Sequence, residues 1–311
     1  MSENSGYSVC AVIVTYNRIN DLRTTIAEYE KQTFLPASVI VVDNAATDGT
    51  YEFLEKWKVQ KGNFERIVIH SDRNLGGAGG FALGIKEGMK RKWDFVFIAD
   101  DDAVPEPDML EKLIECYKKV KNKDRVAALC TRVQDQNGIA CEHRSYIKKG
   151  LLFIHRYYTK PEDYGRECFS VDLLSFVGAL VKRTTVEKIG LPLAEYFIHD
   201  DDTEYATRIR KTGRILCVPG SIMKHPASTK NKDWVEYYET RNYVDYIRRH
   251  YGRRYGFFAE VEKYIKKCSI IAAVFKHRSR NFREMNRTAI KDARNGRFGI
   301  SSLYKPGQEI G

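Results

Sequence analysis

The chain has 311 residues, of which 43% are hydrophobic and 12% aromatic, so it can bury a sizeable core and is not a disordered polymer. Its formal charge of +11 suggests a nucleic-acid-binding protein, but residues 226–311 hold 19 Lys and Arg against 9 Asp and Glu, which leaves residues 1–225 almost neutral. The seven cysteines are scattered without a CxxC pair, which argues against a disulfide framework and against a zinc site.

Neither a targeting signal nor a membrane span is expected. The first ten residues, MSENSGYSVC, lack a basic stretch followed by an apolar one, so we predict no secretory signal. The longest apolar run of the C-terminal part, from Cys268 to Phe275, is shorter than the roughly 20 residues that a bilayer requires. Together with the unpaired cysteines, these features favour a cytoplasmic protein.

Strand-length apolar runs alternate with segments of helical periodicity in the first half of the chain. We expect strands at 9–16, 39–43, 66–71, 95–99 and 126–132. We expect helices at 19–31, 47–58, 79–91 and 108–121. This alternation is typical of an α/β fold built on a parallel sheet.

The second half of the chain is less regular. Residues 135–170 are polar and aromatic without clear periodicity, which predicts a loop-rich insertion over one rim of the sheet. Regular structure resumes at 171–182, and a helix is expected from Thr203 onward within 196–211. From residue 226 the chain is basic, rich in tyrosine and helical in periodicity. We therefore divide the chain into a body, 1–225, and a C-terminal region, 226–311.

Polar residues follow each of the first four predicted strands, where an open parallel sheet binds its ligands. They are TYNR from Thr15, DNAATDG from Asp43, RNLGGAGG from Arg73 and DDD from Asp100. The segment at Asp43 could equally be a turn that ends in a helix cap. The glycine run allows a backbone to approach an anion closely and to aim N–H groups at it, although a flexible loop is the alternative.

Asp100, Asp101 and Asp102 are the most informative residues. Adjacent carboxylates at the end of the apolar run FVFIA repel one another and lose solvation. A divalent cation reverses that cost, because Mg²⁺ and Mn²⁺ prefer hard oxygen ligands such as carboxylates and the phosphates of a nucleotide. These three residues therefore predict a metal and nucleotide site rather than an acidic turn.

A second acidic cluster, from His199 to Glu204, opens a predicted helix. Helix capping accounts for one of its carboxylates but not for all four. Closely spaced carboxylates push their pKa values apart, which can yield a base that removes a hydroxyl proton, and a solvated helix start is the alternative. His225, from sequence alone, is more often a surface or core residue than a ligand.

The ordered set of motifs resembles the family 2 inverting glycosyltransferases of the GT-A fold, over about residues 8–245. RNLGGAGGF, FIADDD and FIHDDDTEY are most similar to the bacterial galactofuranosyltransferases, with rhamnosyltransferases of cell-surface polysaccharides next. The resemblance implies a Rossmann-like GT-A domain with a mostly parallel central sheet in 1–225, followed by a basic helical tail. His199 and Asp200 depart from the galactofuranosyl pattern, which leaves the acceptor and the donor sugar open.

The resemblance assigns a role to each matching position. Donor binding would fall to Thr15, Arg18, Asp43, Arg73, Asn74, Gly76, Gly77, Asp100 and Asp101. Asp100, Asp102 and His225 would hold the metal, and the imidazole favours Mn²⁺ over Mg²⁺. Asp202 would be the catalytic base, and His199, Asp201 and Glu204 would bind the acceptor.

The activity that this resemblance implies is sugar transfer with inversion from a UDP- or dTDP-activated donor. UDP-galactofuranose is the first expectation, dTDP-rhamnose the alternative, and the acceptor would be a hydroxyl of a growing, polyprenyl-linked glycan. Basic residues among aromatic ones in the tail suit an anionic membrane surface, so we expect a peripheral location on the inner face of the cell membrane, with a solvated helical pair as the alternative. A nucleic-acid-binding protein with the same tail would leave the acidic strand ends unexplained.

Overall fold

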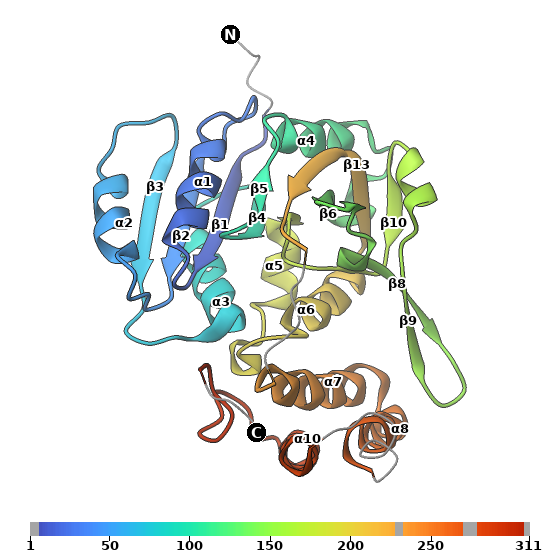
Figure 1. Cartoon of the computed structure of the whole chain (residues 1–311). Coiled ribbons are helices and arrows are strands. Elements are labelled where there is room, and N and C mark those ends of the chain that lie inside the picture. Colours follow the sequence, from blue (N-terminus) through green and yellow to red (C-terminus); the bar gives the residue numbers. More distant parts are fainter. Residues whose placement is uncertain (1–5, 228–232, 270–278, 308–311) are drawn as a thin grey trace.

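The computed structural model describes residues 6–227, 233–269 and 279–307. A central sheet is flanked by helices on both faces, and the C-terminal helices form a further layer next to the carboxyl ends of the first strands (Figure 1). The sheet order is β10-β13-β6-β12-β4-β1-β2-β3, with the short strands β5 and β7 paired to β13 and β6. The α/β class expected from the sequence is therefore present.

The half of the sheet from β4 to β3 is fully parallel. It consists of β1 (Val9–Thr15), β2 (Ser38–Asp43), β3 (Glu65–His70) and β4 (Phe95–Asp100). Thr15 pairs with Asp43, and Val14 pairs with Asp100, so the strands end at nearly the same level. This register brings together the polar residues that follow the strands.

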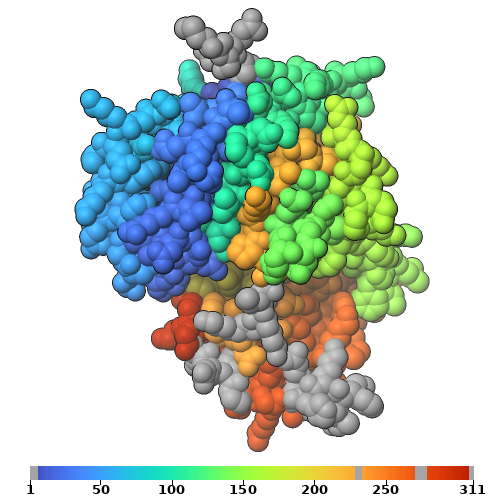
Figure 2. All heavy atoms as spheres, turned by 45° about the horizontal axis from the view of Figure 1, so that its top comes forward, coloured from blue at the N-terminus to red at the C-terminus, as the bar shows by residue number. Residues whose placement is uncertain are grey.

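The other half of the sheet contains antiparallel pairs. Its strands are β6 (Val126–Asp135), β10 (Phe169–Val171), β12 (Ala179–Lys182) and β13 (Arg214–Lys224), with β5 (Val104–Pro105) and β7 (Gly138–Ile139) at its margin. Strand β12 is antiparallel to both β4 and β6, whereas β6 and β13 are parallel. In the space-filling view the orange β13 lies between teal and green segments from much earlier in the chain (Figure 2).

Helices cover the two faces of the sheet and close two hydrophobic cores. They are α1 (Ile19–Tyr29), α2 (Thr50–Lys58), α3 (Gly76–Gly88), α4 (Met109–Lys119), α5 (Arg183–Ile189) and α6 (Asp201–Arg210), with short 3₁₀ turns η1 (Lys123–Arg125) and η4 (Ala194–Tyr196). Alternate residues of β1 enter different cores, Ile13 on one side and Val12 on the other. This alternation is the period of a strand buried on both faces.

The glycines of α3 serve mainly to let this helix approach β1. A Cβ at Gly80 would lie 2.5 Å from Val14, and a Cβ at Gly84 would lie 2.4 Å from Val12. The helix begins at Gly76, three residues earlier than the periodicity predicts, because the run of glycines carries no hydrophobic pattern. The flexible loop considered for this run is therefore replaced by helix.

Residues 135–170, expected to be rich in loops, contain a β-hairpin of β8 (Arg144–Lys149) and β9 (Ile154–Tyr158) together with the turns η2 (Cys141–His143) and η3 (Pro161–Gly165). With β11 (Leu173–Leu174) the hairpin forms a three-stranded sheet. The fully buried Arg144 fixes this sheet to the body, donating from Nε to the Thr131 carbonyl at 3.0 Å and from a terminal nitrogen to the Val177 carbonyl at 2.7 Å. In the sequence this anchor is a single arginine, and no local pattern indicates that its side chain is buried.

The C-terminal region is helical, as expected. It comprises α7 (Val235–Tyr251), α8 (Arg253–Lys263), the π-turn η5 (Tyr264–Cys268) and α10 (Arg280–Arg294). The apolar run that begins at Cys268, and the basic Lys276 and Arg278, lie largely or wholly outside the described residues. Among the helices that are described, none has the length and apolar character needed to cross a membrane.

Candidate functional site

Three potential metal ligands meet at the ends of β4 and β13. One ligand atom each from Asp100, Asp102 and His225 lies within 4.8 Å of the others. His225 follows β13, and its N–H donates to the Gln134 carbonyl at 2.8 Å, which fixes its backbone. Two carboxylates and one imidazole are a donor set that suits a divalent transition metal such as Mn²⁺, so these residues fit the predicted ion.

Burial and mutual repulsion dominate the electrostatics of the aspartates. Burial, and then the charge of Asp102, raise the pKa of Asp100 to about 6. Burial raises the pKa of Asp101 to about 7, although Thr15 and Arg18 oppose the shift. Burial alone would raise the pKa of Asp102, but its contacts with His225 and Arg18 hold it below the usual value.

Arg18 supplies positive charge beside these carboxylates. Its guanidinium contacts Asp102 closely and lies 3.3 Å from an oxygen of Asp101. Asp102 in turn lies 3.2 Å from Nε2 of His225, and this contact raises the pKa of His225 against the effect of burial. The aspartate cluster is thus partly neutralised by Arg18 and His225.

Three cavities lie at this edge of the sheet, and one of them, of about 510 Å³, is lined by Asp102, Gln134 and His225. The large cavity, of about 740 Å³, is lined by all three metal-ligand candidates and by His199, Asp201 and Asp202. The small cavity, of about 380 Å³, is lined by Thr15, Asn44, Asn74, Gly76 and Asp101, and on its other side by Trp234 and Pro306. The two cavities share Arg18, Gly77, Asp100 and Ile198, so they form one continuous site. Another cavity, of about 670 Å³ and lined by Arg125, Arg210 and Lys211, contains none of the predicted site residues.

The loop before α6 is held in an unusual backbone conformation. Phe197, His199 and Asp200 have φ values of +66°, +66° and +59°, which non-glycine residues rarely adopt. Each such residue costs on the order of 1 kcal/mol or more, so neighbouring contacts must hold it.

Helices on both sides supply those contacts. Nδ2 of the buried Asn242 on α7 lies 2.9 Å from the Ile198 carbonyl and 2.8 Å from the His199 carbonyl. On the other side, the Ala78 N–H donates to the Phe197 carbonyl at 3.1 Å. A Cβ at Gly76 would lie only 1.9 Å from that carbonyl oxygen, and Gly76 itself has a φ of +70°. Glycine is therefore required where α3 meets the loop.

Asp201 and Asp202 begin α6 at the wall of the large cavity. Oδ1 of Asp202 accepts hydrogen bonds from the Thr203 N–H at 2.6 Å and from the Thr203 hydroxyl at 3.2 Å. Burial, and then the charge of Asp202, raise the pKa of Asp201 well above its usual value. This raised pKa favours the protonated form of Asp201.

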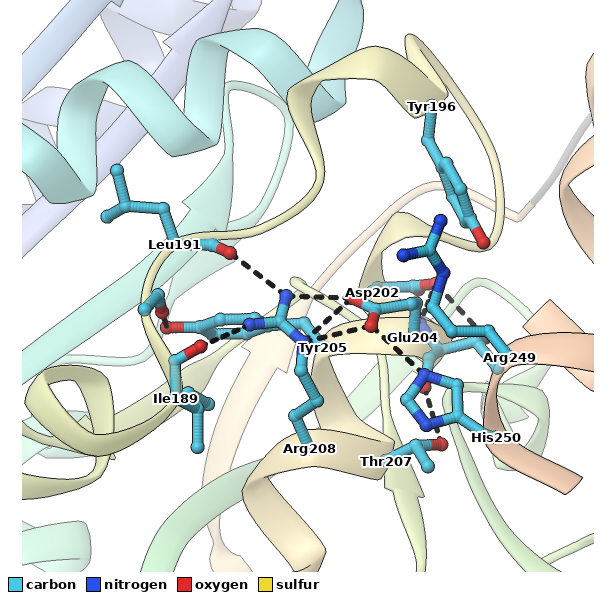
Figure 3. Close-up of polar contacts among 12 residues, drawn as sticks. Ile189, Leu191, Tyr196, Asp202, Glu204, Tyr205, Thr207, Arg208, Arg249 and His250 are labelled. Carbon is cyan, nitrogen blue, oxygen red and sulfur yellow. Dashed lines mark hydrogen bonds and ion pairs between the residues drawn. The ribbon is translucent and has the colours of Figure 1, made fainter. Parts of the chain in front are cut away.

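Glu204 does not fit the acceptor-binding role expected for it. Its side chain is 1% exposed, and its carboxylate lies 2.7 Å from Arg208 and 3.0 Å from Nε2 of His250 (Figure 3). Glu204 is absent from the described lining of both cavities. It ties α6 to α7, a function that its position after Asp202 in the sequence does not reveal.

Asp43 and Arg73 also lie apart from the cavities, judged from the described residues. Asp43 is 2% exposed and accepts from the Ala46 N–H at 2.9 Å, while its other oxygen lies 2.8 Å from Nδ1 of His70. The next residue, Asn44, lines the small cavity instead and donates to Oδ1 of Asn74 at 3.1 Å. Arg73 is exposed on the adjacent loop. The turn after β2 therefore reaches the small cavity through Asn44, whereas Asp43 is buried.

The glycine run offers less to an anion than the sequence suggests. The N–H groups of Leu75, Gly76 and Ala78 already donate to Asn44, Asn74 and Phe197. Gly77 lines both cavities, and a Cβ there would meet nothing within 4 Å. Within this run, Gly77 is therefore the position with open space beside the site.

The three-stranded sheet and the turn before it bring further residues to the large cavity that were not predicted. Arg156 and Tyr158 lie on β9, His143 ends η2 just before β8, and Ser175 follows β11. Nδ1 of His143 lies 2.8 Å from the Ser175 hydroxyl, and its ring centroid lies 5.3 Å from that of His225. Burial and the neighbouring Arg144 lower the pKa of His143 to about 3, so the ring is neutral near pH 7. No periodicity or motif in this segment marks these residues.

Comparison with known proteins places the chain in a family. Residues 10–190 match the family model described as glycosyl transferase family 2. The chain is 31% identical over 207 residues to galactofuranosyltransferase GlfT1 of Mycobacterium tuberculosis, which covers 66% of each protein. It is 30% identical over 229 residues to GlfT1 of Mycolicibacterium smegmatis, covering 71% of this chain and 72% of that protein.

Solved structures share the fold at lower identity. One is the mannosyltransferase PcManGT from Pyrobaculum calidifontis in complex with GDP-Man and Mn²⁺, with a TM-score of 0.55 and 16% identity over 95% of this chain and 78% of that one. Another is S. aureus TarS 1-349 in complex with UDP, with a TM-score of 0.57 and 14% identity over 97% of this chain and 98% of that one. The fold expected from the motifs is thereby confirmed.

Proposed function

Because the chain belongs to glycosyl transferase family 2, we propose that it moves a sugar from a UDP-activated donor to a hydroxyl group of a cell-surface glycan, with inversion. One observation carries this proposal: a donor set for a divalent cation and the carboxylate of Asp202 line the same cavity. The names of the relatives at 30–31% identity support UDP-galactofuranose as the first donor to test.

The donor would lie across both cavities. Its nucleoside would occupy the small cavity, beside Thr15, Asn44 and Asn74, and its sugar would extend past Gly77 into the large one. Asp100, Asp102 and His225 would hold Mn²⁺ or Mg²⁺, which neutralises negative charge on a diphosphate leaving group. Arg18 adds a fixed positive charge at the junction of the two cavities.

Asp202 would act as the general base. Thr203 fixes one of its carboxylate oxygens, which leaves the other to accept the proton of the acceptor hydroxyl. The hydroxyl oxygen attacks the anomeric carbon, and the bond from that carbon to the diphosphate oxygen breaks on the opposite face. The electron pair departs with the nucleoside diphosphate, so the configuration inverts and no covalent intermediate with the enzyme forms.

The acceptor would bind on the remaining wall of the large cavity. His199 and Asp201 line this wall, together with Arg156 and Tyr158 from the hairpin. Glu204 is left out of this group because its carboxylate is already paired with Arg208 and His250. The acceptor that we propose is a polyprenyl-linked glycan.

A nucleotide-sugar screen tests the proposal. The protein would be mixed with UDP-galactofuranose, dTDP-rhamnose or GDP-mannose, with Mn²⁺ or with EDTA, and its melting temperature and the release of nucleoside diphosphate would be recorded. We expect UDP-galactofuranose with Mn²⁺ to give the largest increase in melting temperature. Preference for dTDP-rhamnose would identify rhamnose as the donated sugar. No effect of any nucleotide sugar would refute the proposed activity.

The predicted membrane contact gains support from the surface of α8 and the hairpin tip. Leu151 of the hairpin tip, Phe257 of α8 and Ile265 of η5 are 78%, 59% and 49% exposed, and Arg253 and Arg254 of α8 are exposed as well. The Tyr255 hydroxyl donates to the Gly150 carbonyl at 2.8 Å, which joins the hairpin tip to α8. Exposed basic and apolar side chains on these neighbouring elements suit an anionic bilayer.

Vesicle binding tests this contact. The double variant Leu151→Ser/Phe257→Ser should lose most of its co-sedimentation with vesicles that contain phosphatidylglycerol. Val59→Ser is the matched control, because Val59 is 79% exposed but lies at the end of α2. Equal sedimentation of the double variant and the wild type would contradict a membrane role for this surface.

A further inference from the structure

The small cavity has a wall that comes from the far end of the chain. Strand-end residues such as Asn44 and Asn74 line one side, whereas Trp234, Pro306 and Gly307 line the other. In Figure 1 the red C-terminal segment lies beside the carboxyl ends of the first strands, near α3. The last described residues of the chain therefore meet the first motifs.

From these positions we infer that Trp234 and the C-terminal segment 299–307 form part of the nucleotide site and hold the nucleoside of the donor. This inference rests on the proposed function and deepens it, because no motif in residues 226–311 predicts a role in donor binding. It also gives the tail a function that is separate from membrane contact.

Specific hydrogen bonds fix the start of the segment to the body. The Gly299 N–H donates to the Glu195 carbonyl at 2.7 Å, and the Gly299 carbonyl accepts from Arg241 at 2.7 Å. Arg241 is 1% exposed and also donates to the Tyr196 carbonyl at 3.0 Å. One buried arginine on α7 thus joins the C-terminal segment to the loop that precedes Asp202.

Two tyrosines of α7 fix the rest of the segment. The Tyr238 hydroxyl accepts from the Ser301 N–H at 3.0 Å and donates to the Tyr304 carbonyl at 2.7 Å. The ring of Tyr304 lies 5.0 Å from that of Tyr237, centroid to centroid. Ordering a chain end costs conformational entropy at every residue, so these contacts hold the segment in a defined place beside the cavity.

Trp234 supplies a buried donor without a partner. Its side chain is 8% exposed, and its indole Nε1 is buried and has no hydrogen-bond partner among the described residues. A buried tryptophan N–H normally finds an acceptor. We assign this missing acceptor to a hydroxyl, carbonyl or phosphate oxygen of the nucleotide, because Trp234 lines the small cavity that the nucleotide would occupy.

The chemistry of the whole cavity suits a nucleoside. Tyr16, Phe197 and Trp234 offer aromatic surface, while Asn44 and Asn74 offer amide groups. A nucleobase has flat faces that pack on aromatic rings and polar edges that bond to amides. The junction with Asp100 and Arg18 then lies where a diphosphate would continue toward the large cavity.

Two truncations of the full chain test the inference. Deletion of 300–311 removes Pro306 and Gly307 from the wall but keeps Trp234 and both hydrogen bonds of Gly299, whereas deletion of 308–311 keeps Pro306 and Gly307. With UDP and Mn²⁺ in a calorimeter, we expect the longer deletion to raise the Kd for UDP by about tenfold or more and the shorter one to leave it nearly unchanged. Equal Kd values for the longer deletion and the wild type would overturn the inference.

Point variants separate the indole donor from general packing. Trp234→Phe removes the N–H and should raise the Kd for UDP by roughly three- to tenfold, with a matching rise in KM and little change in kcat. Trp57→Phe is the matched control, because Trp57 is 4% exposed in a core that is remote from the cavity. An unchanged Kd in Trp234→Phe would show that the indole N–H does not contact the nucleotide.

Hydrogen exchange of the intact wild type provides a test that does not depend on the folding of a variant. With UDP and Mn²⁺, amides in 299–307 should exchange more slowly, as should those near Asn44 and Asn74. Protection near the asparagines without protection of 299–307 would refute the inference but leave the proposed function standing. If the wild type bound neither UDP nor another nucleoside diphosphate, the proposed function and the inference would both fail.

Discussion

The strand ends and the loop before α6 carry the two halves of the site, and they are built differently. Asp100 and the residues after β1 and β2 are placed by the regular pairing of parallel strands. Asp202 is placed by a loop with three positive φ values, which contacts from α3 and α7 hold in position. The strand-end residues of the proposed donor half thus need only strand register. The loop of the proposed acceptor half instead depends on supporting contacts from α3 and α7, which are distant in the sequence.

The largest effect is expected from Asp202→Asn in the acceptor half. Loss of a general base should lower kcat by about 10²- to 10⁴-fold, while the Kd for UDP stays close to that of the wild type. Asp201→Asn is the companion variant and should reduce kcat much less, because burial already favours the protonated form of Asp201. Near-normal turnover of Asp202→Asn in a steady-state assay would remove Asp202 from the mechanism.

In the donor half, His225→Ala should weaken the metal site. We expect the Mn²⁺ concentration for half-maximal UDP binding to rise about tenfold or more, because one of three ligands is lost. His155→Ala, an exposed position on β9, should leave the titration unchanged. A normal Mn²⁺ titration in His225→Ala would show that this imidazole does not bind the ion.

Asn242→Ala tests the hydrogen bonds from α7 that hold the loop of the acceptor half. Removal of this amide leaves buried carbonyls of the α6 loop without a donor, which should cost about 2–3 kcal/mol of unfolding free energy. The same change should lower kcat more than it weakens UDP binding. Urea unfolding would measure the stability, with the exposed Asn63→Ala as the control. Equal losses of kcat and of UDP affinity would argue that the two halves are not held separately.

Two glycines of α3 separate the stability of the fold from binding in the donor half. Gly80→Ala would bring a Cβ to 2.5 Å from Val14 and should destabilise the fold by about 1–3 kcal/mol. Gly77→Ala meets no atom within 4 Å, so it should preserve the melting temperature but raise the KM for the donor. A large loss of stability in Gly77→Ala would contradict its assignment to the cavity wall.

The smallest effect concerns pH. The pKa of His143 is about 3 in the folded protein, well below that of an unfolded histidine, so the unfolded chain binds more protons below about pH 6.5. Stability should therefore fall as the pH decreases from 7 to 5, by about 1–2 kcal/mol from this residue. The variant His143→Gln should lose that part of the dependence, measured by urea unfolding in EDTA. An identical pH dependence of stability in both proteins would show that the pKa of His143 is not lowered in the folded state.

The sequence predicted most of what local pattern determines. The parallel strands, the two aspartate clusters and the helical C-terminal region follow from hydrophobic periodicity and from residues at strand ends. The same logic could not tell which of Asp43 and Asn44 faces the small cavity. Asp43 instead contacts His70, a residue of another strand that no local pattern links to it. Nor could it detect that Glu204 is paired with His250 of α7.

Residues that depend on tertiary contacts escaped prediction for a common physical reason. His143 and Arg156 reach the large cavity only because Arg144 anchors the hairpin to the body. Trp234 directly precedes α7, and Pro306 belongs to a segment that Arg241 and Tyr238 of α7 hold beside the small cavity. Neither arrangement leaves a periodic or local signal in the sequence.

The contact between Gly76 and the Phe197 carbonyl limits which mutations the protein tolerates. A side chain of any size at position 76 would overlap a backbone oxygen, which cannot turn aside as a flexible side chain can. In a saturation library selected for folded protein, position 76 should return glycine alone. Position 165, where a Cβ would meet nothing within 4 Å and the backbone is ordinary, should accept many residues. The most restricted position of the domain would then be one that carries no side chain.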